Sequence, residues 1–152
     1  LYVPTEEMSF GSDMDKFIGK TDGNFTKIVR KLVIDMGSRV VLRTPVGNPE
    51  IWKNPAPPGY VGGAARANWQ YGNGVMPSEA LSIIDASGSL TIAKISAGVR
   101  SFKAGSIHWI ANNSPYIMPL EEGWSTQAPQ GMRRLTILEF EETVNSIVRE
   151  FS

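Results

Sequence analysis

A proline-dense segment, residues 44–70, most constrains what this chain can fold into. Its sequence, TPVGNPEIWKNPAPPGYVGGAARANWQ, holds five of the ten prolines in the 152-residue chain. Proline lacks the backbone N–H that helix interiors and central strands need, so most of this segment is predicted to be a long Pro/Gly-rich loop. Loops of this length in compact domains are usually functional or wrap a neighbouring surface. Trp52 and Tyr60 are therefore candidate contact residues.

The residues before the loop follow the period of a helix that is buried on one face. Its apolar positions recur at spacings of three and four: Phe25, Ile28, Val29, Leu32, Val33, Met36 and Val40. Pro45 disfavours helical geometry in the preceding residue, so the helix is expected to end by Arg43 or Thr44. Residues 1–23 carry several helix breakers and two candidate core anchors, Phe17 and Ile18. We expect them to form a partly ordered N-terminal arm ahead of a single domain, residues 24–152.

Two strands and a helix are predicted after the loop. Alternation over residues 67–71 places Ala67, Trp69 and Tyr71 on one face of a strand. Within residues 75–105, the spacing of Ile92, Ile95, Val99 and Phe102 fits a helix that ends by Gly105. Ser87 or Ser89 is its candidate cap, although LTIAKI alone could form a strand. Residues 106–111 read as a second strand with Ile107 and Trp109 on one face.

The last predicted element is a C-terminal helix that begins after Thr126 and Pro129. Its apolar face is formed by Ile137, Phe140, Val144, Ile147, Val148 and Phe151. Leu135 and Leu138 point away from that face, so we expect the helix to be covered twice, once by its own domain and once by another surface. The expected fold is α+β, a short antiparallel sheet packed against long N-terminal and C-terminal helices.

Composition excludes several classes of function. Fifteen basic and fifteen acidic residues leave no net charge to attract nucleic acid or a membrane. The absence of cysteine excludes disulfides, thiolate metal sites and thiol catalysis. No apolar run approaches the roughly 20 residues needed to cross a bilayer, so we expect a soluble protein with no membrane partner.

Catalytic motifs are also missing from the sequence. His108 is the only histidine, and a zinc site would need three or four ligands. Glu121 and Glu122 form a carboxylate pair, but adjacent residues diverge, whereas acid–base pairs usually come from separate elements. No phosphate-binding glycine loop and no G-x-S-x-G elbow occurs. The sequence predicts no catalytic set, no cofactor and no metal.

Two groups of basic residues remain. Arg30, Lys31, Arg39 and Arg43 line the outside of the first long helix, while Arg133 and Arg134 open the last one. The simpler interpretation is a solvated helix face. They would face DNA only if several copies brought them together, because phosphate attraction grows with the number of charges neutralised.

One stretch is typical of a known family. Residues 112–132 read NNSPYIMPLEEGWSTQAPQGM, and they follow TPV, a long loop and ARANWQ and precede an amphipathic helix. This pattern, over most of residues 24–150, resembles the neck or tail-completion proteins of long-tailed double-stranded DNA bacteriophages. Many relatives read T-P-V-D-T-G-R in a shorter loop, where this chain has Gly47 and a longer loop.

The resemblance implies a virion protein of the head–tail junction, assembled in the host cytoplasm. It implies a ring, about six copies, between the portal or head-closure proteins and the tail terminator or tail tube, with phage DNA passing through its lumen. The candidate contact residues with sibling subunits or partners are Trp52, Tyr60, Arg66, Trp69, Tyr116, Leu120, Glu121, Glu122, Trp124, Gln127, Pro129 and Met132. The candidate DNA-facing residues are the six basic residues of the two helices.

Three alternatives stay open at this level. The chain could be a tail terminator or head-closure ring component, which differs in the ring on which it stacks. It could be a small hydrolase or sugar-binding enzyme that uses Glu121 or Glu122. It could also be a DNA-binding protein that uses the basic helix face. Sequence cannot separate packing within the chain from packing between chains at the Glu121–Trp124 corner.

Overall fold

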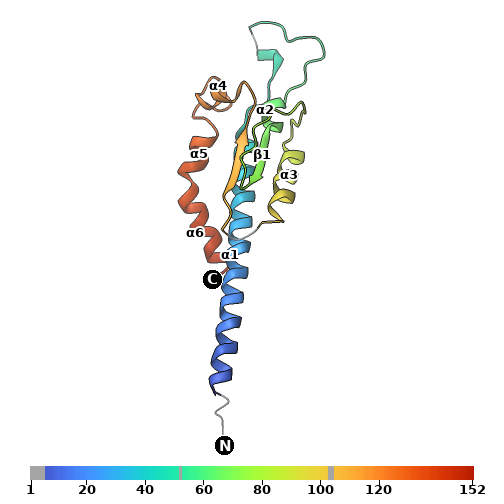
Figure 1. The fold of residues 1–152 in the computed structure, drawn as a ribbon. Helices are drawn as coiled ribbons and strands as arrows, with labels where there is room; N and C mark the ends of the chain where they lie inside the picture. The colour runs from blue at the N-terminus through green and yellow to red at the C-terminus, as the bar shows by residue number, and fades with distance from the viewer. Residues whose placement is uncertain (1–5, 52, 103–104) are drawn as a thin grey trace, which may run out of the picture.

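The computed structural model describes residues 6–51, 53–102 and 105–152 of the chain. Within them, a two-stranded antiparallel sheet is surrounded by helices, which is an α+β arrangement (Figure 1). The elements are α1 (Glu6–Arg43), the 3-10 helix η1 (Pro49–Ile51), α2 (Ala64–Ala67), β1 (Trp69–Asn73), α3 (Ser89–Val99), β2 (His108–Asn112), α4 (Ile117–Glu121), α5 (Arg133–Leu138) and α6 (Phe140–Glu150).

Helix α1 is much longer than the sequence predicted. It ends at Arg43 as expected, but it begins at Glu6 and runs for 38 residues. Residues expected to form an arm therefore continue the helix, which extends past the rest of the protein in Figure 1. Glycine inside a helix costs only about 1 kcal/mol relative to alanine, so the glycines of this region lower its helix propensity without ending it. The side chains of Phe17 and Ile18 lie outside the described residues.

The loop between α1 and α2 has little regular structure. Among the described residues of 44–63, η1 is the only helical turn, and no strand occurs. In Figure 1 the loop projects from the end of the protein opposite the start of α1. The loop thus extends beyond the sheet and the helices.

The sheet pairs β1 with β2 and places Tyr71 opposite Ile110. Trp69, Tyr71 and Ile110 face the core, as side-chain alternation along each strand requires. The prediction that Ala67 joins the first strand was wrong, because residues 64–67 form α2. The predicted face of the second strand was also reversed, since Ile107 precedes β2 and is exposed while Ile110 packs inward.

The core lies between α1, α3 and the sheet. Its buried members are Val33, Val40, Val41, Trp69, Ile95, Val99 and Phe102. Burying a side chain such as Ile95 stabilises the fold by about 1.5–3 kcal/mol. Trp69 donates from Nε1 to Oγ1 of the fully buried Thr44 at 2.7 Å, which joins the end of α1 to the start of β1.

Helix α3 confirms the predicted helix over this region. Its N-cap position is Gly88, and the Ser87 hydroxyl accepts a hydrogen bond from the Ser89 N–H at 3.2 Å. The Asp85 carboxylate accepts hydrogen bonds from the backbone N–H of Gly88 (3.0 Å) and of Thr91 (2.8 Å). The Thr91 hydroxyl also donates to Asp85 at 2.8 Å. A buried carboxylate thus accepts hydrogen bonds from two amides at the start of α3, where a helix leaves amides without partners of its own.

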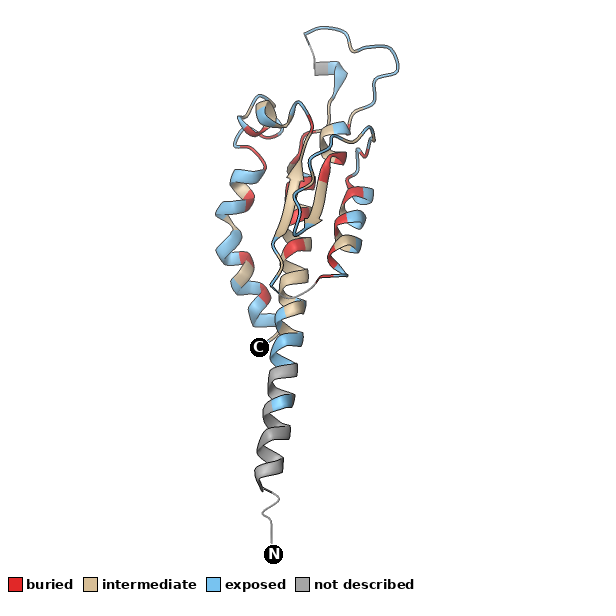
Figure 2. Ribbon diagram, in the orientation of Figure 1, coloured by how far each residue is buried: buried red, intermediate tan, exposed pale blue. Residues whose placement is uncertain are grey.

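The predicted C-terminal helix is broken at Glu139 into α5 and α6, and most of its apolar face lies outside the interior of the chain. Of that face only Ile147 is buried, whereas Thr136 and Thr143 are buried beside it. Both helices pack on α1, and Figure 2 shows exposed residues along much of their surface. This orientation follows from the surface of α1 on which the two helices pack. Because α1 presents Arg39 and Arg43 there, the polar side of α5–α6 faces inward and contacts them.

Candidate functional site

Residues 114–134 form a corner between α4 and α5, and we call them the corner. They overlap most of residues 112–132, the stretch that resembles the phage family. Glu121, at the end of α4, is buried and points at the start of α5. Its carboxylate accepts hydrogen bonds from the backbone N–H groups of Met132, Arg133 and Arg134, each at 2.9 Å. Three amides that α5 would leave unpaired are therefore satisfied by one side chain. No sequence rule places a helix cap this far before its helix.

The environment of Glu121 favours its charged form. Burial is the largest influence and raises the pKa of this carboxyl. The backbone donors of Arg133, Met132 and Arg134, together with the Arg133 charge, outweigh it and hold the pKa below its ordinary value. The side chain is thus an ionised cap rather than a proton donor at neutral pH.

Two glycines let the corner close tightly. Gly131 adopts φ +79°, and a Cβ there would lie 2.5 Å from the Glu121 carbonyl oxygen. Gly123 adopts φ +89°, and its Cβ would lie 2.4 Å from the Pro129 carbonyl oxygen. L-residues rarely adopt such φ values, and both approaches are closer than any Cβ tolerates. Glycine at positions 123 and 131 is therefore a requirement of this geometry.

Gln127 ties the corner to the start of the long loop. Its side-chain Nε2 donates to the Val46 carbonyl at 3.0 Å, and its Oε1 accepts from the Val46 N–H at 3.2 Å. The amide side chain pairs with both polar groups of one backbone residue, as a neighbouring strand would. Arg66 closes the same region by donating to the carbonyls of Leu42, Thr44 and Ala86.

The predicted contact residues therefore divide into two groups. Trp69, Glu121 and Met132 are buried within the chain, Leu120 is half-buried, and Arg66 and Gln127 are hydrogen-bonded to their own backbone. Tyr60, Tyr116, Glu122, Trp124 and Pro129 are exposed. Trp52 lies outside the described residues.

Three large side chains of the corner, two aromatic residues and a methionine, are exposed. Trp124 is 77% exposed although it directly follows the tightly packed Gly123. Tyr116 and Met118 are also largely exposed. We call Tyr116, Met118 and Trp124 the corner surface. Sequence reasoning singled out two of the three and missed Met118, whose place in a short helix gave no signal.

A second apolar surface lies on the C-terminal helices. Ile137, Leu138, Phe140 and Val148 are exposed, with Leu138 at 75%, and Val144 is half-buried. We call these five residues the C-terminal apolar face. The periodicity of the sequence identified most of them as one apolar face, without showing which surface covers it. The structure turns them away from α1.

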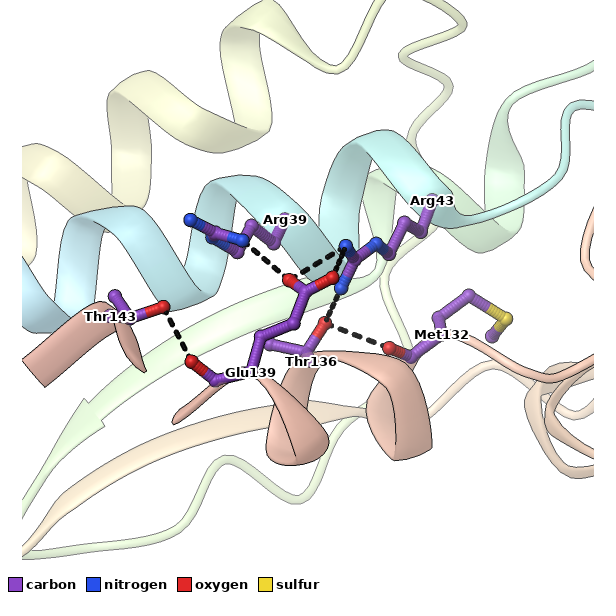
Figure 3. A network of polar contacts seen from close by, with 6 residues as sticks. All are labelled: Arg39, Arg43, Met132, Thr136, Glu139 and Thr143. Atoms are coloured by element: carbon purple, nitrogen blue, oxygen red, sulfur yellow. Dashed lines mark hydrogen bonds and ion pairs between the residues drawn. The ribbon is translucent and has the colours of Figure 1, made fainter. Parts of the chain in front are cut away.

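The basic residues of α1 face acidic partners within the chain. Arg39 and Arg43 both contact the Glu139 carboxylate, with Arg43 Nη2 at 2.6 Å from Oε1 (Figure 3). Arg43 also donates to the Thr136 hydroxyl at 3.0 Å. The Arg43 hydrogen bond, with help from Arg39, holds the pKa of Glu139 below its ordinary value. Two arginines thus share one carboxylate at the break between α5 and α6.

Of the remaining candidate DNA-facing residues, two have partners within the chain and two are exposed. Lys31 pairs with Glu150, and Arg30 donates to the Arg100 carbonyl at 2.8 Å. Arg133 and Arg134 are exposed at the start of α5. The structure brings Arg39 and Arg43 together at Glu139, so both are engaged in ion pairs within the chain. Arg133 and Arg134 are therefore the more accessible pair.

Two open cavities occur among the described residues, and their linings contain few reactive side chains. One, of about 210 Å³, lies between the end of α1 and the corner and has no acidic residue in its lining. A second, beside α6, is lined by Glu139 and Glu142, and Glu139 is already paired with the α1 arginines. Over the part of the chain that the structure describes, no group of three metal-ligating side chains occurs. No helix in that part is long and apolar enough to cross a membrane.

The fold and the corner define a small α+β protein whose exposed apolar surfaces flank a tightly hydrogen-bonded turn. Comparison with known proteins extends this description no further. No family model, no curated protein and no solved structure matches the chain.

Proposed function

We propose that this chain is a structural subunit of a ring, and that exposed apolar side chains on its corner surface and C-terminal apolar face are covered by sibling subunits and neighbouring proteins. The observation that carries this function is the contrast at the corner: Glu121 and Gln127 serve the chain's own fold, while Trp124 is left in solvent. Contiguous exposed apolar side chains on a soluble protein commonly mark a protein–protein contact.

The corner is suited to presenting a contact surface. Its backbone is fixed by the Glu121 cap, the Gln127–Val46 pair and the close approach at Gly123. A side chain on a fixed backbone loses less entropy on binding, so more of its buried area contributes to affinity. Aromatic residues such as Trp124 and Tyr116 are the types that most often dominate interface energetics.

The particular ring that we propose is the neck of a long-tailed bacteriophage. The resemblance of residues 112–132 to neck and tail-completion proteins supports this assignment, and the exposed corner surface lies within that same stretch. In this function the ring joins the portal or head-closure proteins to the tail terminator or tail tube. Phage DNA passes through its lumen, and the protein resides at the head–tail junction.

The decisive experiment is a cryo-EM reconstruction of intact particles, together with particles that lack this protein. We expect density for a ring of about six copies, as cyclic symmetry allows, and filled tailless heads beside headless tails when the protein is missing. A ring found one layer nearer the head or the tail would make it a head-closure or tail-terminator component. A stable two-fold dimer, or normal tailed particles without the protein, would contradict the proposal.

Glutamate substitutions separate this function from an enzyme. Glu122→Gln changes an exposed carboxylate without touching the α5 cap, whereas Glu121→Gln weakens the cap. If Glu122→Gln abolished a measured hydrolytic turnover and left assembly intact, a hydrolase or sugar-binding function would replace the structural one.

A further inference from the structure

We propose that the outer face of α3 on one copy packs against the C-terminal apolar face of the next copy. This contact rests on the proposed ring function and names the two surfaces that would close the ring. Figure 1 places α5 and α6 on one side of the sheet and α3 on the opposite side. Two different surfaces on opposite flanks are what a head-to-tail contact needs, and a closed ring follows when the rotation per subunit is a whole fraction of a turn.

Helix α3 offers an exposed face with small and apolar side chains. Thr91, Ile95 and Val99 face the core and are buried. The side that points to solvent carries Leu90, Ala93 and Ala97, all exposed. Because alanine side chains are short, a partner helix can approach this face closely and place larger side chains beside Leu90.

The C-terminal apolar face offers the matching ridge. Phe140, Val144 and Val148 are spaced by four residues on α6 and therefore form one row along its surface. Thr143 and Ile147 on the neighbouring side of the helix are buried in the chain's own interior. The row is thus only partly covered in the isolated chain. Rows of this spacing pack into the grooves of a facing helix.

The charges beside the two surfaces are opposite. Residues 89–100 contain two basic residues, Lys94 and Arg100, and no acidic one, and both are exposed. Helix α6 contains three acidic residues and one basic residue. Glu141 precedes Val144 by three positions, so it lies at the edge of the exposed row. Complementary charges at the rim of an apolar contact favour this pairing and set its orientation.

Charge reversal tests the contact directly. We expect Lys94→Glu and Glu141→Lys each to weaken self-association of the full chain about tenfold, and the double variant to recover most of the loss. Lys27→Glu and Glu79→Lys are matched controls, because both residues are exposed and lie outside the two surfaces. Self-association is measured by analytical ultracentrifugation over a concentration series at low salt.

Cross-linking tests the geometry, since the chain has no native cysteine. Ala97→Cys and Val148→Cys are made singly and together and treated with a short bis-maleimide. We expect the double variant to give a ladder that extends beyond dimers, and a mixture of the two single variants to stop at a heterodimer. Products of the double variant that stop at dimers, or homodimers formed equally well by Ala97→Cys alone, would overturn the head-to-tail contact.

The remaining outcomes distinguish the two proposals. Unchanged association in both charge variants, or a chain that stays monomeric at every concentration, overturns the α3–α6 contact. A ring seen at the head–tail junction but joined through other surfaces overturns this contact and leaves the neck function in place. Association through α3 and α6 in a protein that is absent from that junction would support this contact and overturn the neck function.

Discussion

The Glu121 carboxylate caps α5 by accepting a hydrogen bond from the backbone N–H of Met132, eleven residues later in the chain, at 2.9 Å. The same carboxylate also accepts the next two amides of the helix. A pair of adjacent glutamates that could be mistaken for a catalytic motif therefore contains one structural anion and one solvent-exposed neighbour. This division can be measured.

Replacing the cap should lower stability, and replacing its neighbour should not. We expect Glu121→Ala to lower the free energy of unfolding by roughly 2 kcal/mol, because three buried amides lose a charged acceptor. Glu122→Ala is the control and should change it by less than about 0.5 kcal/mol. Urea denaturation followed by circular dichroism measures both. Equal stability of the two variants would contradict the capping role.

The contribution of Glu121 should also depend on pH. Its pKa in the folded protein lies below the value of an unfolded glutamate, about 4.3. The stabilisation is thus fully present above that pH and is lost as the pH falls toward the folded pKa. The difference between wild type and Glu121→Gln should therefore shrink on acidification. A difference that stays constant down to about pH 3 would show that charge plays no part.

Gly131 should tolerate alanine less well than Gly59 does. Both adopt positive φ, +79° and +75°, so both variants carry the same backbone strain, about 1–2 kcal/mol. Only at Gly131 does the added Cβ meet other atoms, the Glu121 carbonyl oxygen at 2.5 Å and its carboxylate. We expect Gly131→Ala to cost at least about 2 kcal/mol more than Gly59→Ala in thermal or urea unfolding. Similar losses in the two variants would mean that the corner opens easily.

Two large side chains of the corner should separate folding from assembly. Met132 is fully buried, so Met132→Ala should cost about 2–5 kcal/mol through the cavity it leaves. Trp124→Ala should leave stability within about 0.5 kcal/mol of wild type, because the side chain is already in solvent. Its expected defect is in ring formation or particle assembly, assayed by electron microscopy. A Trp124 variant that assembles normally would remove the corner surface from the interface.

His108 should titrate below the ordinary range. It packs between Phe102 and Tyr71, with its Nδ1 at 2.8 Å from the Tyr71 hydroxyl, and burial lowers its pKa. As the only histidine, it gives an unambiguous NMR titration. We expect a midpoint below about 6.5, and stability that falls with pH below that value because the unfolded chain binds the proton more readily. A midpoint at or above 6.5 would contradict the packed, neutral ring.

The two sets of basic residues should differ in DNA binding by the assembled protein. Arg133→Ala and Arg134→Ala should each reduce the slope of log affinity against log salt by about 0.9 if each contacts one phosphate. Arg39→Ala should leave the slope unchanged, because Arg39 is paired with Glu139. Filter binding to duplex DNA over a salt series measures both. An equal effect of Arg39→Ala would show that the ion pair opens to DNA.

Local sequence rules succeeded where the cause lies within a few residues. Pro45 marked the end of α1, and the spacing of Ile92, Ile95 and Val99 marked α3. They failed at the start of α1, because glycine weakens a helix without ending it. They placed Phe140 and Val148 on one apolar face but could not show that both are exposed, since periodicity does not reveal which neighbour a helix face meets.

The corner shows the same boundary between local and distant causes. Its glycines and turn residues were visible in the sequence, yet the partners of Glu121 and Gln127 lie 11 and 81 residues away along the chain. Hydrogen bonds over such separations follow from the fold, which no short pattern encodes. The arginines of α1 were likewise placed on an outer face because Glu139, 96 and 100 residues distant, could not be assigned to them.

Helix α1 has a mechanical consequence. At 1.5 Å per residue its 38 residues form a rod about 57 Å long. In Figure 1 the sheet, α3, α5 and α6 lie beside its later turns, and the rest of the helix extends away from them. A rod anchored at one end transmits displacement to its far end with leverage. Small rotations of the anchored body would therefore sweep the opposite tip through a much larger arc than any other described element.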